Sequence, residues 1–305
     1  MPLFVIFVFG AVILGSGALL SPALPTSQPR IGLAAAFSLA LIIGGAIFWA
    51  MLFGWDVLLI DYMVFFLISV IFLGGTLSYG QKRAEARGTT LDDADQGWPG
   101  PTDLALLAVV ALLLIGMVMF LPIPPTVSAE PPTRATLSNE PPAFRALVAY
   151  LGQQLTQPMD ITQYATGAVL VMLCVWLSID LGVELRDKPF GRVLMAVTLV
   201  IGAALLRMGS YQLLMGAVFA LAFSIFALHY TRHQYPIDGF MAGLMLGATL
   251  LSHVPLCAVM LLGYGLALLL LALRRSALGR RAWAMLVLGV PLVAVAATSP
   301  WLVWR

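Results

Sequence analysis

The residues of this chain that could do chemistry are few, because most of its length is apolar. His229 and His233 are four residues apart, which is the spacing of two metal ligands on one face of a helix. Arg232 stands between them, and we expect no third histidine or carboxylate to join them. The pattern therefore indicates a histidine pair at a membrane interface and predicts no metal site.

Carboxylates inside apolar runs are costly in a membrane and often mark function. Asp180 and Glu184 are four residues apart near the end of one apolar run, and Asp238 begins another. We expect the first two at the membrane surface, in contact with Arg186 and Lys188. A transporter would more often carry charges at mid-depth on several helices. The distribution of charge therefore disfavours a transporter.

The composition is that of an integral membrane protein. Of 305 residues, 61% are hydrophobic and 10% charged, far below the roughly 25% charged residues of globular domains. Cys174 and Cys257 lie in apolar runs and predict neither a disulfide nor a metal site. Runs of about 20 apolar residues match a hydrocarbon core of about 30 Å. We expect an all-α polytopic bundle of about ten transmembrane helices, near residues 2–20, 31–53, 57–79, 103–122, 161–184, 192–206, 212–230, 237–253, 255–273 and 283–303.

The basic residues indicate the orientation of the chain in the membrane. If alternate loops between the spans lie on opposite sides of the membrane, 12 of the 16 lysines and arginines fall on the same side. The positive-inside rule makes that face cytoplasmic. With ten spans, both termini and the segment 123–160 then face outward, and the inner membrane of a bacterium is the expected location. The basic cluster "RRSALGRR" is typical of contact with lipid headgroups, and no nucleic-acid partner is expected.

The order of polar and apolar segments suggests three parts. Residues 1–80 form a three-helix membrane appendage, and residues 81–102 form a polar cytoplasmic linker. Residues 103–305 form a seven-helix membrane body with an external loop at 123–160.

The external loop contains a short amphipathic helix. Prolines prevent regular helix in "PIPPTVSAEPPTR", and apolar residues then recur with helical spacing over 142–155, with Arg145, Ala149 and Gln153 opposite them. About 14 residues are too few to span a membrane, so we expect this helix on the outer interface or on the outer ends of the bundle. Its apolar residues are Phe144, Leu147, Val148, Leu151 and Leu155.

A span, an outward loop with a helix introduced by "PPAF", and a bundle together resemble the membrane-embedded glycosyltransferases of the GT-C class. "LGVELRDKPFGRVLMAVTLV" is similar to the cytoplasmic turn between two core spans of that class. "GFMAGLMLGATLLSHVPLCAVMLLGYGLALLLLAL" and "LVLGVPLVAVAATSPWLVW" are similar to its later helices. The resemblance covers about residues 103–305 and rests on pattern rather than on a diagnostic motif.

The resemblance implies sugar transfer from a lipid-phosphate donor at the outer face. It also implies an outward carboxylate that acts as general base or holds a divalent cation. Where the class places its acid, this chain reads "LPIPPTVSAE", so the first carboxylate is Glu130, set among prolines. Glu130 and Asp160 are the candidate catalytic residues, and Arg207, His253 and Arg145 are the candidates for binding the substrate.

The alternative is a non-catalytic subunit of a larger membrane complex that kept the bundle and lost the acid. In that case Phe144 and Leu147 would turn toward lipid or a partner protein. The expected partners are membrane lipids, a lipid-linked sugar and such a complex. The sequence leaves open the sugar, the cofactor, any pigment or quinone, and the identity of a partner.

Overall fold

The computed structural model describes residues 2–20, 30–87, 101–120, 141–273 and 278–304. Eight helices in these ranges are long and apolar enough to cross a membrane, and Val57–Leu73 and Pro236–Ser252 are shorter apolar helices. The expected all-α multi-pass bundle is therefore confirmed. The helices are α1 (Pro2–Leu20), α2 (Ile31–Phe53), α3 (Val57–Arg87), α4 (Pro101–Phe120), α6 (Ala143–Leu155), α7 (Met159–Glu184), α8 (Lys188–Arg207), α9 (Tyr211–His233), α10 (Pro236–Ser252), α11 (Val254–Leu273), α12 (Arg280–Ala284), the π-helical η3 (Met285–Gly289) and α13 (Val290–Trp304).

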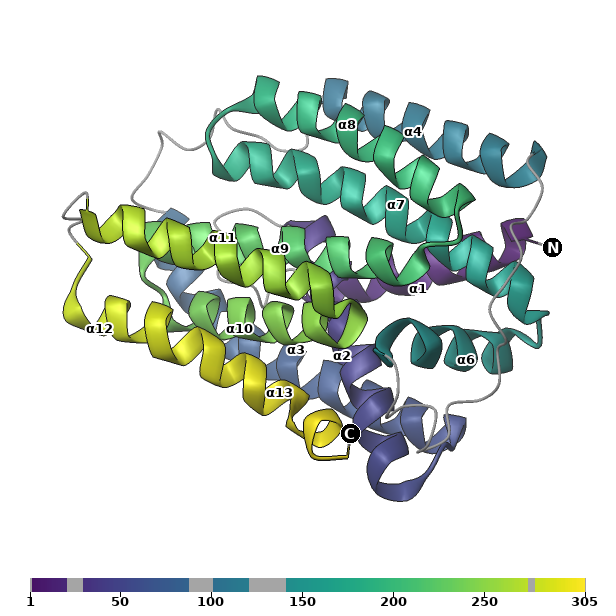
Figure 1. Cartoon of the computed structure of the whole chain (residues 1–305), viewed down its shortest axis with the longest axis horizontal. Coiled ribbons are helices and arrows are strands. Elements are labelled where there is room, and N and C mark those ends of the chain that lie inside the picture. Colours follow the sequence, from purple (N-terminus) through teal and green to yellow (C-terminus); the bar gives the residue numbers. More distant parts are fainter. Residues whose placement is uncertain (1, 21–29, 88–100, 121–140, 274–277, 305) are drawn as a thin grey trace.

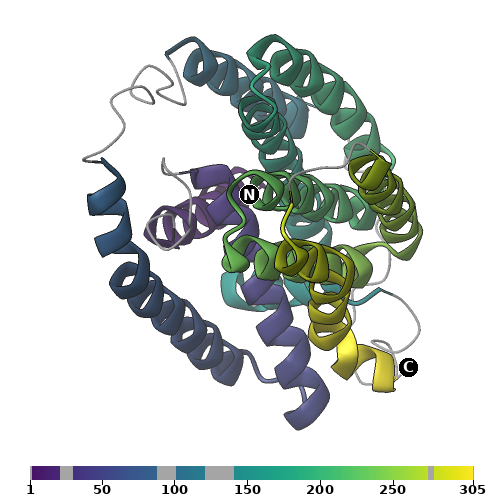
Figure 2. The same cartoon turned by 90° about the vertical axis from the view of Figure 1, so that its left-hand side faces the viewer.

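Helix α2 lies at the centre of the bundle together with α7. In their apolar parts, 72% of the residues of α2 and 78% of those of α7 are buried, against 6% in α11. Helix α2 contacts α1, α3, α6, α7, α9, α10 and α13. Helix α3 lies at the periphery, as Figure 2 shows, and packs mainly on α2. The surface that faces lipid is thus formed by helices such as α3 and α11, while α2 is covered on nearly every side.

The N-terminal helices pack directly against the later part of the chain. Helix α1 contacts α4 and α7, and α2 contacts helices as late as α13. Helix α3 continues to Arg87 and α4 begins at Pro101, so most of the expected linker lies outside the described residues. The division into an appendage and a body stays a prediction, but α1 and α2 belong to the same packed core as α7 and α9.

The bundle has two ends with different chemistry. Helix α6 and the start of α1 lie at the right in Figure 1, and α12 lies at the left. We call the first the α6 end; α2 and α10 finish there, and α7 and α9 begin there. We call the second the Arg30 end, where α2 begins and α7 and α9 finish. Arg30, Arg192 and Arg232 lie at this end, as expected from the charge pattern, although its exposure to the cytoplasm stays a prediction.

Helices α7 and α8 form a tightly packed hairpin. Asp187 caps α8 by accepting a hydrogen bond from the Phe190 N–H at 2.8 Å, so α8 starts earlier than the predicted 192–206. Beside this turn, Gly182 and Gly191 lie against each other, and a Cβ on Gly182 would overlap the Gly191 backbone. Further along the hairpin, Gly202 lies against Val171. Small residues thus let the two backbones approach closely.

The glycine strip of α10 was expected to be a packing surface, and this is confirmed. A Cβ on Gly243 would meet Val293 at 2.6 Å, and one on Gly247 would meet the Ala294 carbonyl at 3.1 Å. The strip therefore brings α13 close to α10.

Helix α6 lies across the α6 end of the bundle, as the periodicity predicted. Its contacts are with α2, α3, α7, α9 and α10. Phe144 is 7% exposed and Leu147 1% exposed, and the Phe144 ring stacks on Tyr211 of α9. The idea that Phe144 and Leu147 face lipid or a partner is therefore wrong. These side chains are buried because the inner face of α6 closes the end of this chain's own core.

The polar face of α6 binds the hairpin between α2 and α3. The Trp55 indole N–H donates to Gln153 Oε1 at 2.9 Å. Asp61 of α3 accepts short hydrogen bonds from the Tyr150 hydroxyl and from the Gln154 amide. Burial and the Asp61 carboxylate both raise the pKa of Tyr150, so its hydroxyl keeps its proton and remains a donor. We call these five residues the α6 latch.

Loss of the Asp61 charge should loosen α6. Asp61→Asn should cost about 1.5–3 kcal/mol, the usual contribution of hydrogen bonds to a charged group. It should also speed hydrogen exchange in 143–155, which mass spectrometry of the protein in detergent would measure. Asp56→Asn is the control, because Asp56 caps α3 through the Leu58 and Leu59 amides and asparagine caps equally well. Equal exchange in the two variants would show that the latch does not hold α6.

Candidate functional site

The structure places the predicted site residues unevenly. Glu130 lies outside the described residues. Asp160 is exposed in the first turn of α7, and Arg207 is exposed as the last residue of α8. Arg145 lies in α6, and His253 lies between α10 and α11. All four described candidates are at the α6 end, as expected.

Asp160 and Arg207 each lie close to Tyr164 at this end. Tyr164 follows Asp160 by one helical turn on α7, so the two residues project from nearly the same face. The Arg207 guanidinium lies near enough to Tyr164 to act on it electrostatically, and Tyr164 in turn interacts with Tyr211 at the start of α9. The Tyr211 hydroxyl is buried and has no hydrogen-bond partner among the described residues. We call Asp160, Tyr164, Arg207 and Tyr211 the corner site.

The corner site combines three chemical abilities. An exposed carboxylate can accept a proton, a guanidinium can bind a phosphate through two hydrogen bonds, and tyrosine hydroxyls can orient a polar ligand. Sequence reasoning found Asp160 and Arg207 but missed the two tyrosines. The stretch "LRMGSYQ", which puts Tyr211 four residues after Arg207, was the available signal.

One of the other candidates, His253, serves the structure instead. His253 accepts a hydrogen bond from the Leu256 N–H at 3.1 Å on its Nδ1, which caps the start of α11. Burial lowers the pKa of the His253 imidazole, which favours the neutral ring that can accept this bond. Arg145 lies next to Phe144 in the first turns of α6, and its role in binding a substrate stays a prediction.

An apolar groove of about 400 Å³ runs beside α7. Helices α1, α4 and α7 line it, with Phe7, Leu114, Met172 and Trp176 among its walls. It lies on a different face of α7 from the corner site and offers room for hydrocarbon. Part of its wall comes from α1, which precedes the region that resembles the GT-C class.

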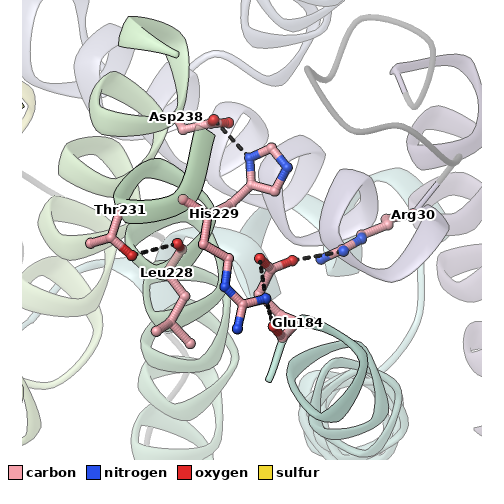
Figure 3. A network of polar contacts seen from close by, with 7 residues as sticks. Arg30, Glu184, Leu228, His229, Thr231 and Asp238 are labelled. Atoms are coloured by element: carbon pink, nitrogen blue, oxygen red, sulfur yellow. Dashed lines mark hydrogen bonds and ion pairs between the residues drawn. The ribbon is translucent and has the colours of Figure 1, made fainter. Parts of the chain in front are cut away.

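The Arg30 end holds a buried ionic cluster that the sequence did not predict. Glu184 accepts from Arg30 at 2.7 Å and lies 3.5 Å from the Arg232 guanidinium, which also donates to the Glu184 carbonyl. Figure 3 shows the carboxylate in this network. Glu184 is 3% exposed and Asp180 0%. The expectation that Arg186 and Lys188 are the partners is wrong for Glu184, which pairs with Arg30 and Arg232 instead, while the position at the membrane interface stays a prediction. Glu184 and Asp180 are buried because the start of α2 and the end of α9 fold over the end of α7.

Beside this cluster, His229 and Asp238 form a second buried pair. His229 Nδ1 lies 2.7 Å from Asp238 Oδ2, and the turn at Gln234 and Tyr235 brings them together. The expectation that no carboxylate joins the histidines is therefore wrong. The His233 ring lies 4.3 Å from that of His229, centroid to centroid. Even so, no group of three or more metal-binding side chains is found in the part of the chain that the structure describes.

Comparison of the chain with family models, with curated proteins and with solved structures finds no match in any of the three.

Proposed function

We propose that the chain is a GT-C-like membrane glycosyltransferase that uses a lipid-phosphate-linked sugar at the α6 end. In this proposal the α6 end faces outward, and the corner site is where the donor phosphate meets the acceptor. The observation that carries the proposal is that Asp160, in the first turn of α7, and Arg207, at the end of α8, both lie close to Tyr164. One is a proton acceptor and the other a phosphate ligand, and they share a corner with two tyrosines.

The transfer requires one bond to form and one to break. Asp160 takes the proton from the acceptor hydroxyl, and the hydroxyl oxygen attacks the anomeric carbon of the sugar. The bond between that carbon and the phosphate oxygen breaks, and the lipid phosphate leaves with the electron pair. Arg207 stabilises the negative charge that develops on the leaving phosphate.

The first test is gentle extraction from native membranes, followed by native mass spectrometry. The proposal expects a small species that carries a polyprenyl phosphate, and Arg207→Met should lose most of this bound lipid. Glycosyl transfer from that lipid should fall about 100-fold or more in Asp160→Asn, the usual contribution of a general base. Asp56→Asn is the matched control, because it removes a charge at the same end but only from a helix cap. Full turnover in Asp160→Asn would refute the assignment of the base.

A non-catalytic subunit is the second candidate, and one observation favours it. Of the described carboxylates at the α6 end, Asp56 caps α3 and Asp61 is held in the α6 latch, so both have structural roles. Recovery only within a large assembly, with ordinary lipids and no lipid-linked sugar, would support this candidate and exclude the transferase. Because the apolar face of α6 is buried, a partner would then bind elsewhere than on Phe144 and Leu147.

A further inference from the structure

The pair of His229 and Asp238 has no role in the proposed transfer, because it lies at the opposite end of the bundle. Asp238 is in the first turn of α10 and is 0% exposed. Its Oδ2 faces His229, as Figure 3 shows, while its Oδ1 is buried without a hydrogen-bond partner among the described residues. A carboxylate in this position is costly unless a positive charge or a proton neutralises it.

The arginines near this pair are bound by another carboxylate. Arg30 and Arg232 both form ion pairs with Glu184, at the ends of α2, α7 and α9. The ion pair of Asp238 is with His229. If His229 were neutral and Asp238 ionised, the buried Asp238 carboxylate would have no cation bonded to it among the described residues.

Within the part of the chain that the structure describes, the other elements packed near Asp238 bring no further compensating charge. The groups whose charges act on it are His229, His233 and Glu184, and the nearby Tyr230 is an uncharged phenol. From η3, Met285 lies against Gly239, the residue after Asp238. The α12 arginines, Arg280 and Arg281, are exposed.

We propose that His229 and Asp238 form a buried proton-binding site, which exchanges its proton with water at the Arg30 end through His233. The site is neutral when it holds one proton, either as imidazolium beside carboxylate or as imidazole beside carboxylic acid. The His233 ring is close to that of His229 and is itself exposed, with Tyr235 stacked on it at 6.0 Å. A proton from water binds the His233 ring and passes to the pair, and release reverses these steps with no other bond changed.

The chain has three histidines, so magnetic resonance can observe this site directly. The protein in lipid nanodiscs would carry ¹⁵N in its histidine rings and ¹³C in its aspartate carboxyl groups, with single variants for assignment. At about pH 8, above the usual histidine pKa of about 6.5, the proposal expects a protonated pair. Either both His229 ring nitrogens carry protons, or Asp238 is a neutral acid. A neutral His229 beside an ionised Asp238 would overturn the proposal, whatever the outcome for glycosyl transfer.

The path through His233 has its own test. His233→Phe should slow exchange of the His229 ring proton with water about tenfold or more, because the exposed carrier is lost. Arg192→Gln is the control at the same end, since Arg192 binds Asp103 of α4 instead. Unchanged exchange in His233→Phe would remove His233 from the path. The wild-type spectra decide the protonation of the pair even if a variant fails to fold.

Discussion

Replacing Glu184 by glutamine should lower the free energy of unfolding by about 3–5 kcal/mol, the usual cost of breaking a buried ion pair from one side. The carboxylate is 3% exposed, and it neutralises Arg30, whose side chain is 11% exposed. Glutamine keeps the size of the side chain but removes the carboxylate that Arg30 and Arg232 share at the junction of α2, α7 and α9. Reversible unfolding in mixed micelles would measure the loss.

Arg192→Gln is the matched comparison for Glu184→Gln. Arg192 also forms an ion pair at this end, with Asp103 at 3.1 Å, but its side chain is 44% exposed. Water screens such a pair, so its loss should cost about 0–1 kcal/mol. If the two variants lose the same stability, the cluster around Glu184 is not what joins the three helices.

Gly182→Ala should be as damaging as the loss of Glu184, for a steric reason. A Cβ at this position would overlap the backbone of Gly191, and backbone cannot move aside as a flexible side chain can. The α7 and α8 hairpin would have to open at its turn, so we expect a loss of about 3 kcal/mol or more, at the upper end of overpacking effects. Thermal unfolding in detergent, followed by circular dichroism, would measure it.

Gly263→Ala supplies the control for the hairpin. Gly263 is also helical, in α11, and a Cβ there would meet nothing within 4 Å. Alanine favours helix over glycine by about 1 kcal/mol in water, so this variant should be neutral or slightly stabilised. If the Gly182→Ala and Gly263→Ala proteins unfold at the same temperature, the hairpin is more loosely packed than the structure indicates.

The sequence predicted the bounds of a helix correctly where the length of an apolar run or the position of prolines alone determines them. The apolar run 31–53 matches α2 at both ends, and the prolines at 142 and 158 delimit α6 to within a few residues. The α6 periodicity also identified the face that is buried. What it could not give was the identity of the surface against which that face packs.

The partners of the ionic residues could not be predicted, because they depend on how distant segments meet. Glu184 has Arg186 and Lys188 close by in sequence, yet it pairs with Arg30 and Arg232, which the fold brings from α2 and α9. Local spacing gives a reliable partner only on the surface of a single helix. At the end of a helix, the segment that folds over that end determines which ionic partner a side chain finds.

The corner site could be predicted in part, unlike the helix bounds, which were predictable, and the ionic partners, which were not. Asp160 and Arg207 were found as single residues near the α6 end, but their proximity depends on the register of the α7 and α8 hairpin. That register is set by the contact of Gly182 with Gly191, about 20 residues away along α7.

The central position of α2 has a consequence for the synthesis of the protein. Helix α2 is made before several of its neighbours, from α6 to α13, which follow about 100 to 250 residues later. At about 5–20 residues per second, its final contacts are missing for many seconds after α2 emerges from the ribosome. During that interval, contacts with α1 and α3, its neighbours in the chain, can stabilise α2. From these contacts we expect that α1, α2 and α3 associate first, and that the bundle is complete only when α13 has been inserted.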